Sequence, residues 1–136
     1  MLPLRHAGLW RFLSVLLLLV VLAATLMPAI WFEDRARVLS WLLHADKWMH
    51  ALTFAFLALW FGGLFARGRY GYIAVGLMAF GLLVEGCQLL VSDRTSDWHD
   101  VAANAAGITA GLLLAAAGLG GWGLWVEQHY ARLRQR

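Results

Sequence analysis

Glu85 is the residue best placed to do chemistry, because it is the only charged residue inside the long apolar segment from Gly71 to Val91. A carboxyl group in such surroundings costs several kcal/mol unless it is paired or protonated. We therefore expect Glu85 to mark a functional site, either within a few ångström of Lys47 or Arg94 or uncharged at pH 7. Gln88 shares its helix face and is either a binding residue or a hydrogen bond between helices.

A second polar group lies at the start of the preceding apolar segment, Trp48 to Ala66. Asp46 and His50 are four residues apart and share a helix face, with Lys47 beside them. His50 is a candidate general base and partner of Glu85, whereas Asp46 is a candidate binding residue or simply a helix N-cap. No paired-histidine or H-E-x-x-H spacing surrounds His50, so we expect no metal here and no other cofactor.

The third polar group lies on a stripe with steps of three or four residues. The stripe consists of Asp97, Asp100, Asn104, Gly107, Gly111, Ala115 and Gly118. Its first part is polar and its second part is small, which is typical of a helix packed closely through a Gly-x-x-x-Gly contact. Asp97 and Asp100 also suit a capped helix start, and Asn104 suits a hydrogen bond between helices. Arg94 precedes the stripe at the same end, and we expect His99 to be a solvated loop residue.

These residues are positioned by apolar segments that predict an all-α membrane protein. The 136 residues are 62% hydrophobic and only 14% charged, whereas soluble domains are about half apolar and a quarter charged. The predicted spans of this single membrane domain are Phe12 to Phe32, Trp48 to Ala66, Gly71 to Val91 and Val101 to Val126. We expect the first to be a retained anchor, not a signal peptide, and the segment from Glu33 to His44 to be a short interfacial helix or a loop.

The charges predict how this four-span bundle is oriented. Seven basic residues fall on one side of the spans, namely Arg5, Arg11, Arg67, Arg69, Arg132, Arg134 and Arg136. The other side carries four basic residues and most of the acidic ones. The positive-inside rule then places both termini in the cytoplasm and the three polar groups near the outer surface. Because the basic residues lie beside apolar spans and not on one continuous face, we read them as topology signals and expect no nucleic-acid partner.

The order and spacing of these fragments resemble the VanZ-like family. The matching positions are D-K-x-x-H at Asp46, Lys47 and His50, E-x-x-Q at Glu85 and Gln88, then Arg94, and D-x-x-x-N-x-x-G-x-x-x-G at Asp100, Asn104, Gly107 and Gly111. The similarity runs from about the end of the first span to the middle of the fourth. It implies a bacterial plasma-membrane protein, some relatives of which lower susceptibility to teicoplanin-type glycopeptide antibiotics by a mechanism that is not established.

We therefore expect an outward-facing polar pocket that binds an envelope lipid, a cell-wall intermediate or a glycopeptide. Lys47 and Arg94 would hold phosphate or carboxylate groups, and Asp100 and Asn104 would orient polar groups. One alternative is an intramembrane enzyme that acts on a lipid head group through Glu85 and His50. A second alternative is a structural or assembly subunit, whose glycine face would meet a partner.

Overall fold

The computed structural model describes residues 1–26, 45–91 and 98–133, and every regular element in these ranges is helical. The long helices are α1 (Ala7–Leu26), α3 (Ala45–Leu64), α4 (Tyr70–Val91), α5 (Trp98–Leu114) and α6 (Trp122–Leu133). A 3-10 turn, η3 (Arg67–Arg69), joins α3 to α4, and a π-helical segment, η4 (Ala115–Leu119), follows α5. The predicted all-α class is confirmed over these ranges.

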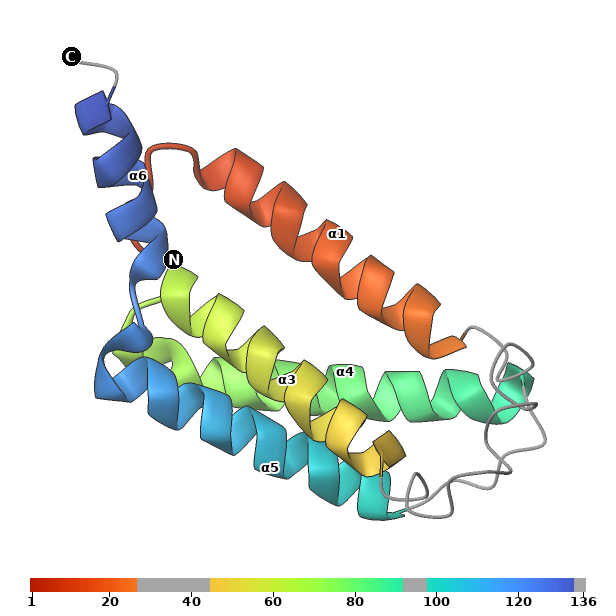
Figure 1. The fold of residues 1–136 in the computed structure, drawn as a ribbon. Coiled ribbons are helices and arrows are strands. Elements are labelled where there is room, and N and C mark those ends of the chain that lie inside the picture. The colour runs from red at the N-terminus through yellow and green to blue at the C-terminus, as the bar shows by residue number, and fades with distance from the viewer. Residues whose placement is uncertain (27–44, 92–97, 134–136) are drawn as a thin grey trace.

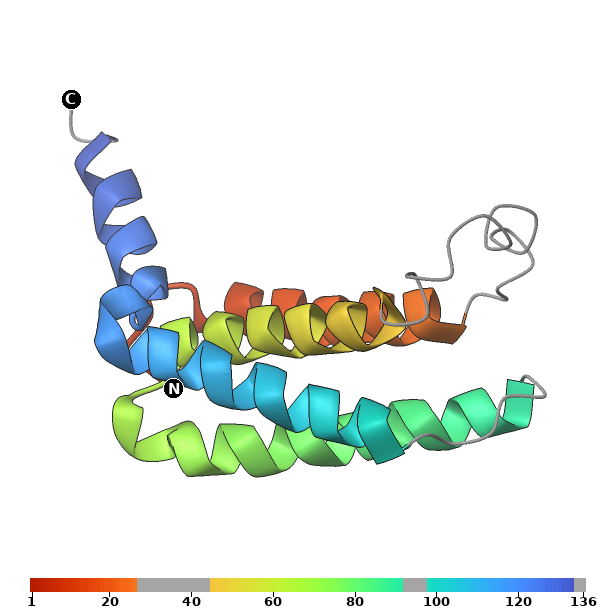
Figure 2. The ribbon, with the colours of Figure 1, turned by 60° about the horizontal axis from the view of Figure 1, so that its bottom comes forward.

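Helices α1, α3, α4 and α5 run alongside one another with alternating directions (Figures 1 and 2). The N-terminus, the start of α6 and the α3–α4 connection lie at one end of this bundle, which we call the terminal end (Figure 1). The starts of α3 and α5 and the ends of α1 and α4 lie at the opposite end, which we call the site end. Helix α6 leaves the bundle at the terminal end and points away from it (Figure 2).

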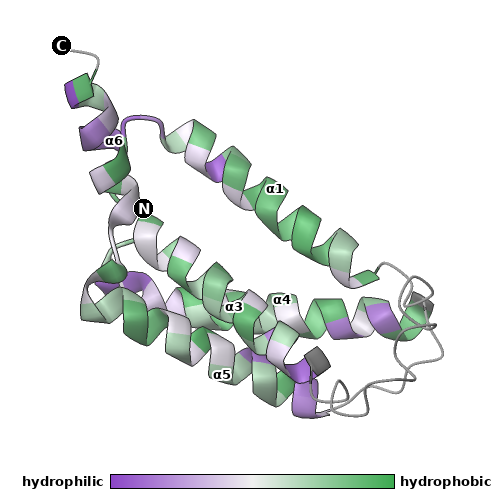
Figure 3. Ribbon diagram, viewed as in Figure 1, coloured by the Kyte–Doolittle hydropathy of each residue, from purple (hydrophilic) through white to green (hydrophobic). Residues whose placement is uncertain are grey.

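Three helical segments are long and apolar enough to cross a membrane: Ala7–Leu26, Arg67–Leu90 and Trp98–Leu119. Hydrophobic residues predominate along these helices (Figure 3), and many of their large apolar side chains are exposed, among them Phe12, Leu19, Val75, Leu83 and Leu113. Helix α3, which contains most of the predicted second span, is also 20 residues long. It is not among these three segments, and Asp46, Lys47 and His50 occupy its first two turns.

The predicted fourth span, Val101 to Val126, extends too far at its C-terminal end. Helix α5 already begins at Trp98, and the helix breaks between Leu119 and Trp122. Gly118 has φ 134° and Gly121 has φ 75°, values in the region that only glycine adopts readily. Gly118 therefore ends the helix instead of extending the packing stripe, and nothing lies within 4 Å of a Cβ placed on it. The segment from Glu33 to His44 lies outside the described residues.

The closest helix contact joins α3 and α5 through small residues. A Cβ on Gly107 would overlap the carbonyl oxygen of Ala51, and one on Gly111 would overlap that of Ala55. Farther along, a Cβ on Gly62 would lie 2.6 Å from Cβ of Ala115. Small residues on both helices thus allow backbone to approach backbone, which is how apolar helices associate where lipid removes the hydrophobic driving force.

Two clusters of buried side chains fill the space between the helices. The central cluster consists of Phe54, Leu57, Ala58, Leu77 and Ile108, from α3, α4 and α5. The second cluster, at the terminal end, consists of Leu4, Trp10 and Leu64. Trp60 and Trp122 pack against this second cluster, with their ring centroids 5.0 Å apart. The indole of Trp60 also donates a hydrogen bond to Ser14 Oγ at 3.0 Å, which ties α3 to α1.

Gly107→Ala should destabilise the bundle by about 1–3 kcal/mol, because its methyl group must push α5 away from the Ala51 carbonyl. Gly76→Ala is the matched control, since Gly76 is helical and a Cβ there meets nothing within 4 Å. That control should be neutral or stabilise by up to about 1 kcal/mol, the helix preference of alanine over glycine. Equilibrium unfolding in detergent micelles measures both, and equal stability of the two variants would contradict the close contact.

Candidate functional site

Four polar side chains from three helices converge at the site end, and we call them the polar cluster: His50, Glu85, Asp100 and Asn104. His50 Nδ1 lies 3.1 Å from Asn104 Oδ1 and 4.0 Å from Glu85 Oε1. One potential ligand atom from each of His50, Glu85 and Asp100 lies within 4.8 Å of the other two. The three sequence motifs that carried these residues therefore meet at one place.

The α3–α5 contact explains why His50 meets Asn104. Gly107 lies against Ala51, the neighbour of His50, and Asn104 is three residues before Gly107 on the same face of α5. Because the two backbones lie so close here, the side chains of His50 and Asn104 reach each other and form a hydrogen bond. Gly81 of α4 leaves room for the amide of Asn104, since a Cβ there would lie 3.0 Å from Asn104 Nδ2.

The polar cluster is buried although it lies near one end of the bundle. His50 is 7% exposed, Glu85 8% and Asn104 1%, while Asp100 is half-buried. Within the part of the chain that the structure describes, Asn104 Nδ2 is buried and has no hydrogen-bond partner. A buried amide left in this way costs about 1–3 kcal/mol. The cluster is therefore poorly suited to a purely stabilising role and well suited to receiving a ligand.

The other predicted site residues are distributed around this cluster. Lys47 is half-buried in the first turn of α3, next to the region where Figure 3 shows hydrophilic residues at the starts of α3 and α5. The side chain of Asp46, and Arg94 and Asp97 entirely, lie outside the described residues. His99, predicted to be a loop residue, lies in the first turn of α5 and is exposed. Lys47, His99, Glu85 and Asp100 each take part in further interactions of their own.

Gln88 interacts with α1, whereas Glu85 lies beside His50 of α3. Its side-chain amide donates a hydrogen bond to the carbonyl oxygen of Thr25 at 3.0 Å. This carbonyl is one of the last four of α1, which accept no hydrogen bond from an N–H group of their own helix. The bond ties α4 to α1, as expected of a hydrogen bond between helices.

The polar cluster can support three kinds of chemistry. An imidazole 4.0 Å from a carboxylate can exchange a proton with it through one water molecule or after a small rotation. The same groups can hold a polar head group by hydrogen bonds and charge. An imidazole and two carboxylates can also coordinate a metal ion. We expected no metal because no local ligand motif is present, but such motifs do not detect ligands that come from three separate helices.

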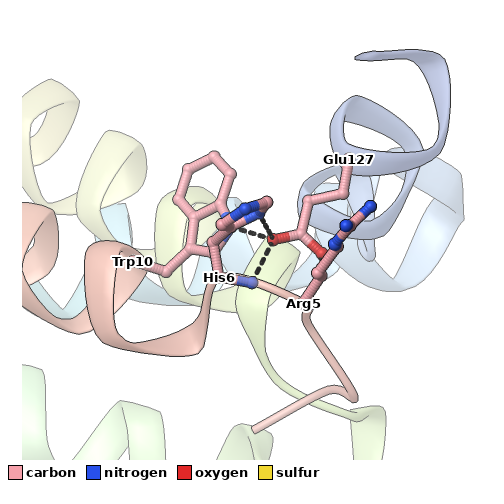
Figure 4. Close-up of polar contacts among 4 residues, drawn as sticks. All are labelled: Arg5, His6, Trp10 and Glu127. Atoms are coloured by element: carbon pink, nitrogen blue, oxygen red, sulfur yellow. Dashed lines mark hydrogen bonds and ion pairs between the residues drawn. The ribbon is translucent and has the colours of Figure 1, made fainter. Parts of the chain in front are cut away.

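A second polar group, which the sequence analysis missed, lies at the terminal end around Glu127 of α6 (Figure 4). Its carboxylate accepts hydrogen bonds from the backbone N–H of Arg5 at 2.6 Å, that of His6 at 2.9 Å and the indole of Trp10 at 2.9 Å. It thus holds the chain just before α1 and joins it to α6. A signal for it was present: Glu127 is the one acidic residue among the basic residues of the predicted cytoplasmic side.

Burial raises the pKa of the Glu127 carboxyl, but the hydrogen bonds from His6, Trp10 and Arg5, with the electrostatic interaction with His6, outweigh it and lower the pKa below its usual range. A carboxylate whose pKa is lowered by folding stabilises the fold above its unfolded pKa, about 4.3. That stabilisation disappears as the pH falls through the folded pKa.

Glu127→Gln should therefore be less stable than the wild type by about 1–2 kcal/mol at pH 7, because charged hydrogen bonds are replaced by neutral ones. The difference should vanish as the pH is lowered from about 5 to about 3. Thermal unfolding in micelles across this range measures it, with Gln128→Ala, at an exposed neighbour, as the control. A difference between wild type and Glu127→Gln that does not change with pH would show that the charge of Glu127 is not responsible.

Comparison with known proteins adds no assignment to this geometry. No family model, no curated protein and no solved structure matches the chain. What the polar cluster does must accordingly be argued from its own residues.

Proposed function

We propose that the chain is a multi-pass protein of the bacterial plasma membrane in which α1, α3, α4 and α5 all cross the bilayer. A helix of 20 residues is about 30 Å long, enough for α3 to span the hydrocarbon core beside its neighbours. Arg5, Arg11, Arg67, Arg69 and Arg132 all lie at the terminal end. By the positive-inside rule this end is cytoplasmic, and the polar cluster faces outward.

The function we propose is the binding of a polar, membrane-associated envelope molecule at the polar cluster. The observation that carries it is the convergence of buried His50, Glu85 and Asn104 with half-buried Asp100 at the site end. Groups of this kind inside a membrane protein normally line a site, since they are costly elsewhere. The ligand class is a lipid head group, a lipid-linked cell-wall intermediate or a glycopeptide. Lys47 and Arg94 hold its anionic groups, and Asp100 and Asn104 orient its polar groups.

Within this proposal the chain is a VanZ-like protein and lowers susceptibility to teicoplanin-type glycopeptides. What supports the family assignment is spatial. His50 comes from D-K-x-x-H, Glu85 from E-x-x-Q, and Asp100 and Asn104 from the fourth-span motif, and the four lie in one cluster. Each motif is short, so its match alone is weak support, but residues from all three motifs in one site support the assignment more strongly.

An intramembrane enzyme acting on a lipid head group is the second candidate. The distance of 4.0 Å between His50 Nδ1 and Glu85 Oε1 favours it, because this pair is within reach for proton transfer through one water molecule. Glu85 would serve as general acid or base and His50 as its partner. The assembly-subunit alternative gains no such support, since α3 covers the face of Gly107 and Gly111 that a partner would need.

Glu85→Ala, Asp100→Ala and Asn104→Ala should each abolish the glycopeptide phenotype of the chain while leaving its membrane abundance largely intact. The reason is that binding residues can be removed without breaking the α3–α5 contact, which rests on small residues. Gly111→Leu is the opposite control and should lower abundance by forcing α5 from Ala55. The measurements are susceptibility in a strain whose envelope admits the drug and immunoblots of membranes.

Loss of the three alanine variants from the membrane to the same extent as Gly111→Leu would contradict the binding proposal. The polar cluster would then hold the helices together, and the structural-subunit alternative would replace the proposed function. If all three variants are present at normal abundance and keep the wild-type susceptibility, the polar cluster is not needed for the phenotype, which also contradicts the proposal.

A further inference from the structure

We infer that His50, Glu85 and Asp100 form a binding site for one divalent transition-metal cation of the zinc class. The inference concerns the site of the proposed function and rests on that cluster being a site. One ligand atom from each residue lies within 4.8 Å of the other two, and none of the three residues is fully exposed. Each residue comes from a different helix, so a bound cation would bridge α3, α4 and α5.

The donor set fits this class of cation. Imidazole nitrogen suits zinc and its first-row neighbours, and carboxylate oxygen is an established zinc ligand as well. Two carboxylates carry a charge that one divalent cation balances. Three protein ligands are also the usual number in zinc sites that keep a position open for water or a ligand oxygen. Such a position would face the head group of the proposed function.

The distances require only local adjustment. Ligand atoms around a tetrahedral zinc ion at about 2.0–2.2 Å lie roughly 3.3–3.6 Å from one another. The separation of 4.0 Å between His50 Nδ1 and Glu85 Oε1 closes to this value by a small side-chain rotation, and the widest separation in the group is 4.8 Å. The helices themselves need not move.

Asn104 is an independent indication that something binds here. It is 1% exposed, and its Oδ1 lies 3.1 Å from His50 Nδ1, the distance of a hydrogen bond. Its Nδ2 has no hydrogen-bond partner in the ranges 1–26, 45–91 and 98–133. The unmet group is an N–H donor, which an oxygen of a water molecule or head group in the open position of the ion would satisfy. When His50 Nδ1 binds the ion, it gives up its hydrogen bond to Asn104, and Asn104 Oδ1 becomes available as a fourth ligand.

The test is zinc binding by the full-length chain, purified in micelles with a histidine-free tag and treated with a chelator. Isothermal titration with Zn²⁺ should show one ion per chain, and Co²⁺ should give a visible absorption spectrum at the same stoichiometry. His50→Gln, Glu85→Gln and Asp100→Asn should each weaken Zn²⁺ binding at least about 30-fold. His129→Gln, which removes an exposed histidine of α6, should leave binding unchanged.

If a variant fails to fold, the thermal stability of the wild-type protein with and without Zn²⁺ still tests the inference. Zn²⁺ in excess of its dissociation constant should raise the unfolding midpoint, whereas Mg²⁺ at the same concentration should not. No stoichiometric binding by the wild type, or equal binding by the wild type and the three site variants, would overturn the inference. If zinc does not bind but Glu85→Ala still loses the glycopeptide phenotype, the proposed function stands without the metal. If zinc binds to the wild type but Glu85→Ala keeps the wild-type glycopeptide phenotype, the metal site stands and the proposed function fails.

Discussion

The close approach of α3 to α5 is the constraint on which the other features depend. Gly107 and Gly111 have no side chain to separate the helices, so the backbone of α5 lies on that of α3 at Ala51 and Ala55. At this separation a short amide on α5 reaches a histidine on α3 across the interface, as Asn104 does. A larger residue at either glycine would open the interface and separate that pair. The packing of α3 on α5 and the pairing of His50 with Asn104 therefore both depend on this one contact.

The two ends of the bundle use their polar groups differently. At the terminal end, the Glu127 carboxylate accepts three hydrogen bonds from the segment preceding α1 and from Trp10, so its charge is matched by donors. At the site end, the amide nitrogen of Asn104 has no partner among the described residues, and His50 stands between a carboxylate and an amide oxygen. The first arrangement stabilises the fold. The second leaves the amide nitrogen of Asn104 for the proposed ligand, which is the usual compromise between stability and function.

Helical spacing and hydropathy predicted much of this structure, because both depend on local sequence. They gave the all-α class and the face of α5 on which Asn104 and Gly107 lie. They did not give the break after α5, since a run of glycines can continue a helix or end it, and only the conformation of Gly118 and Gly121 decides. They also missed Glu127, whose partners are more than 100 residues away in sequence. His50 was predicted to be the partner of Glu85, and the two lie 4.0 Å apart, although local patterns contain no helix arrangement that would give such a distance. The expected closeness of Glu85 to Lys47 or Arg94 stays a prediction.

The central claim is that the polar cluster faces the outside of the cell, and cysteine labelling tests it most directly. Trp98 at the start of α5 and Gly68 in η3 are exposed at opposite ends of the bundle. Trp98→Cys and Gly68→Cys would be made in a Cys87→Ala background, and spheroplasts would be treated with a membrane-impermeant maleimide. The account predicts that the cysteine at position 98 is labelled in intact spheroplasts and that the one at position 68 is labelled only after lysis. The reverse pattern would place the polar cluster in the cytoplasm and contradict the account.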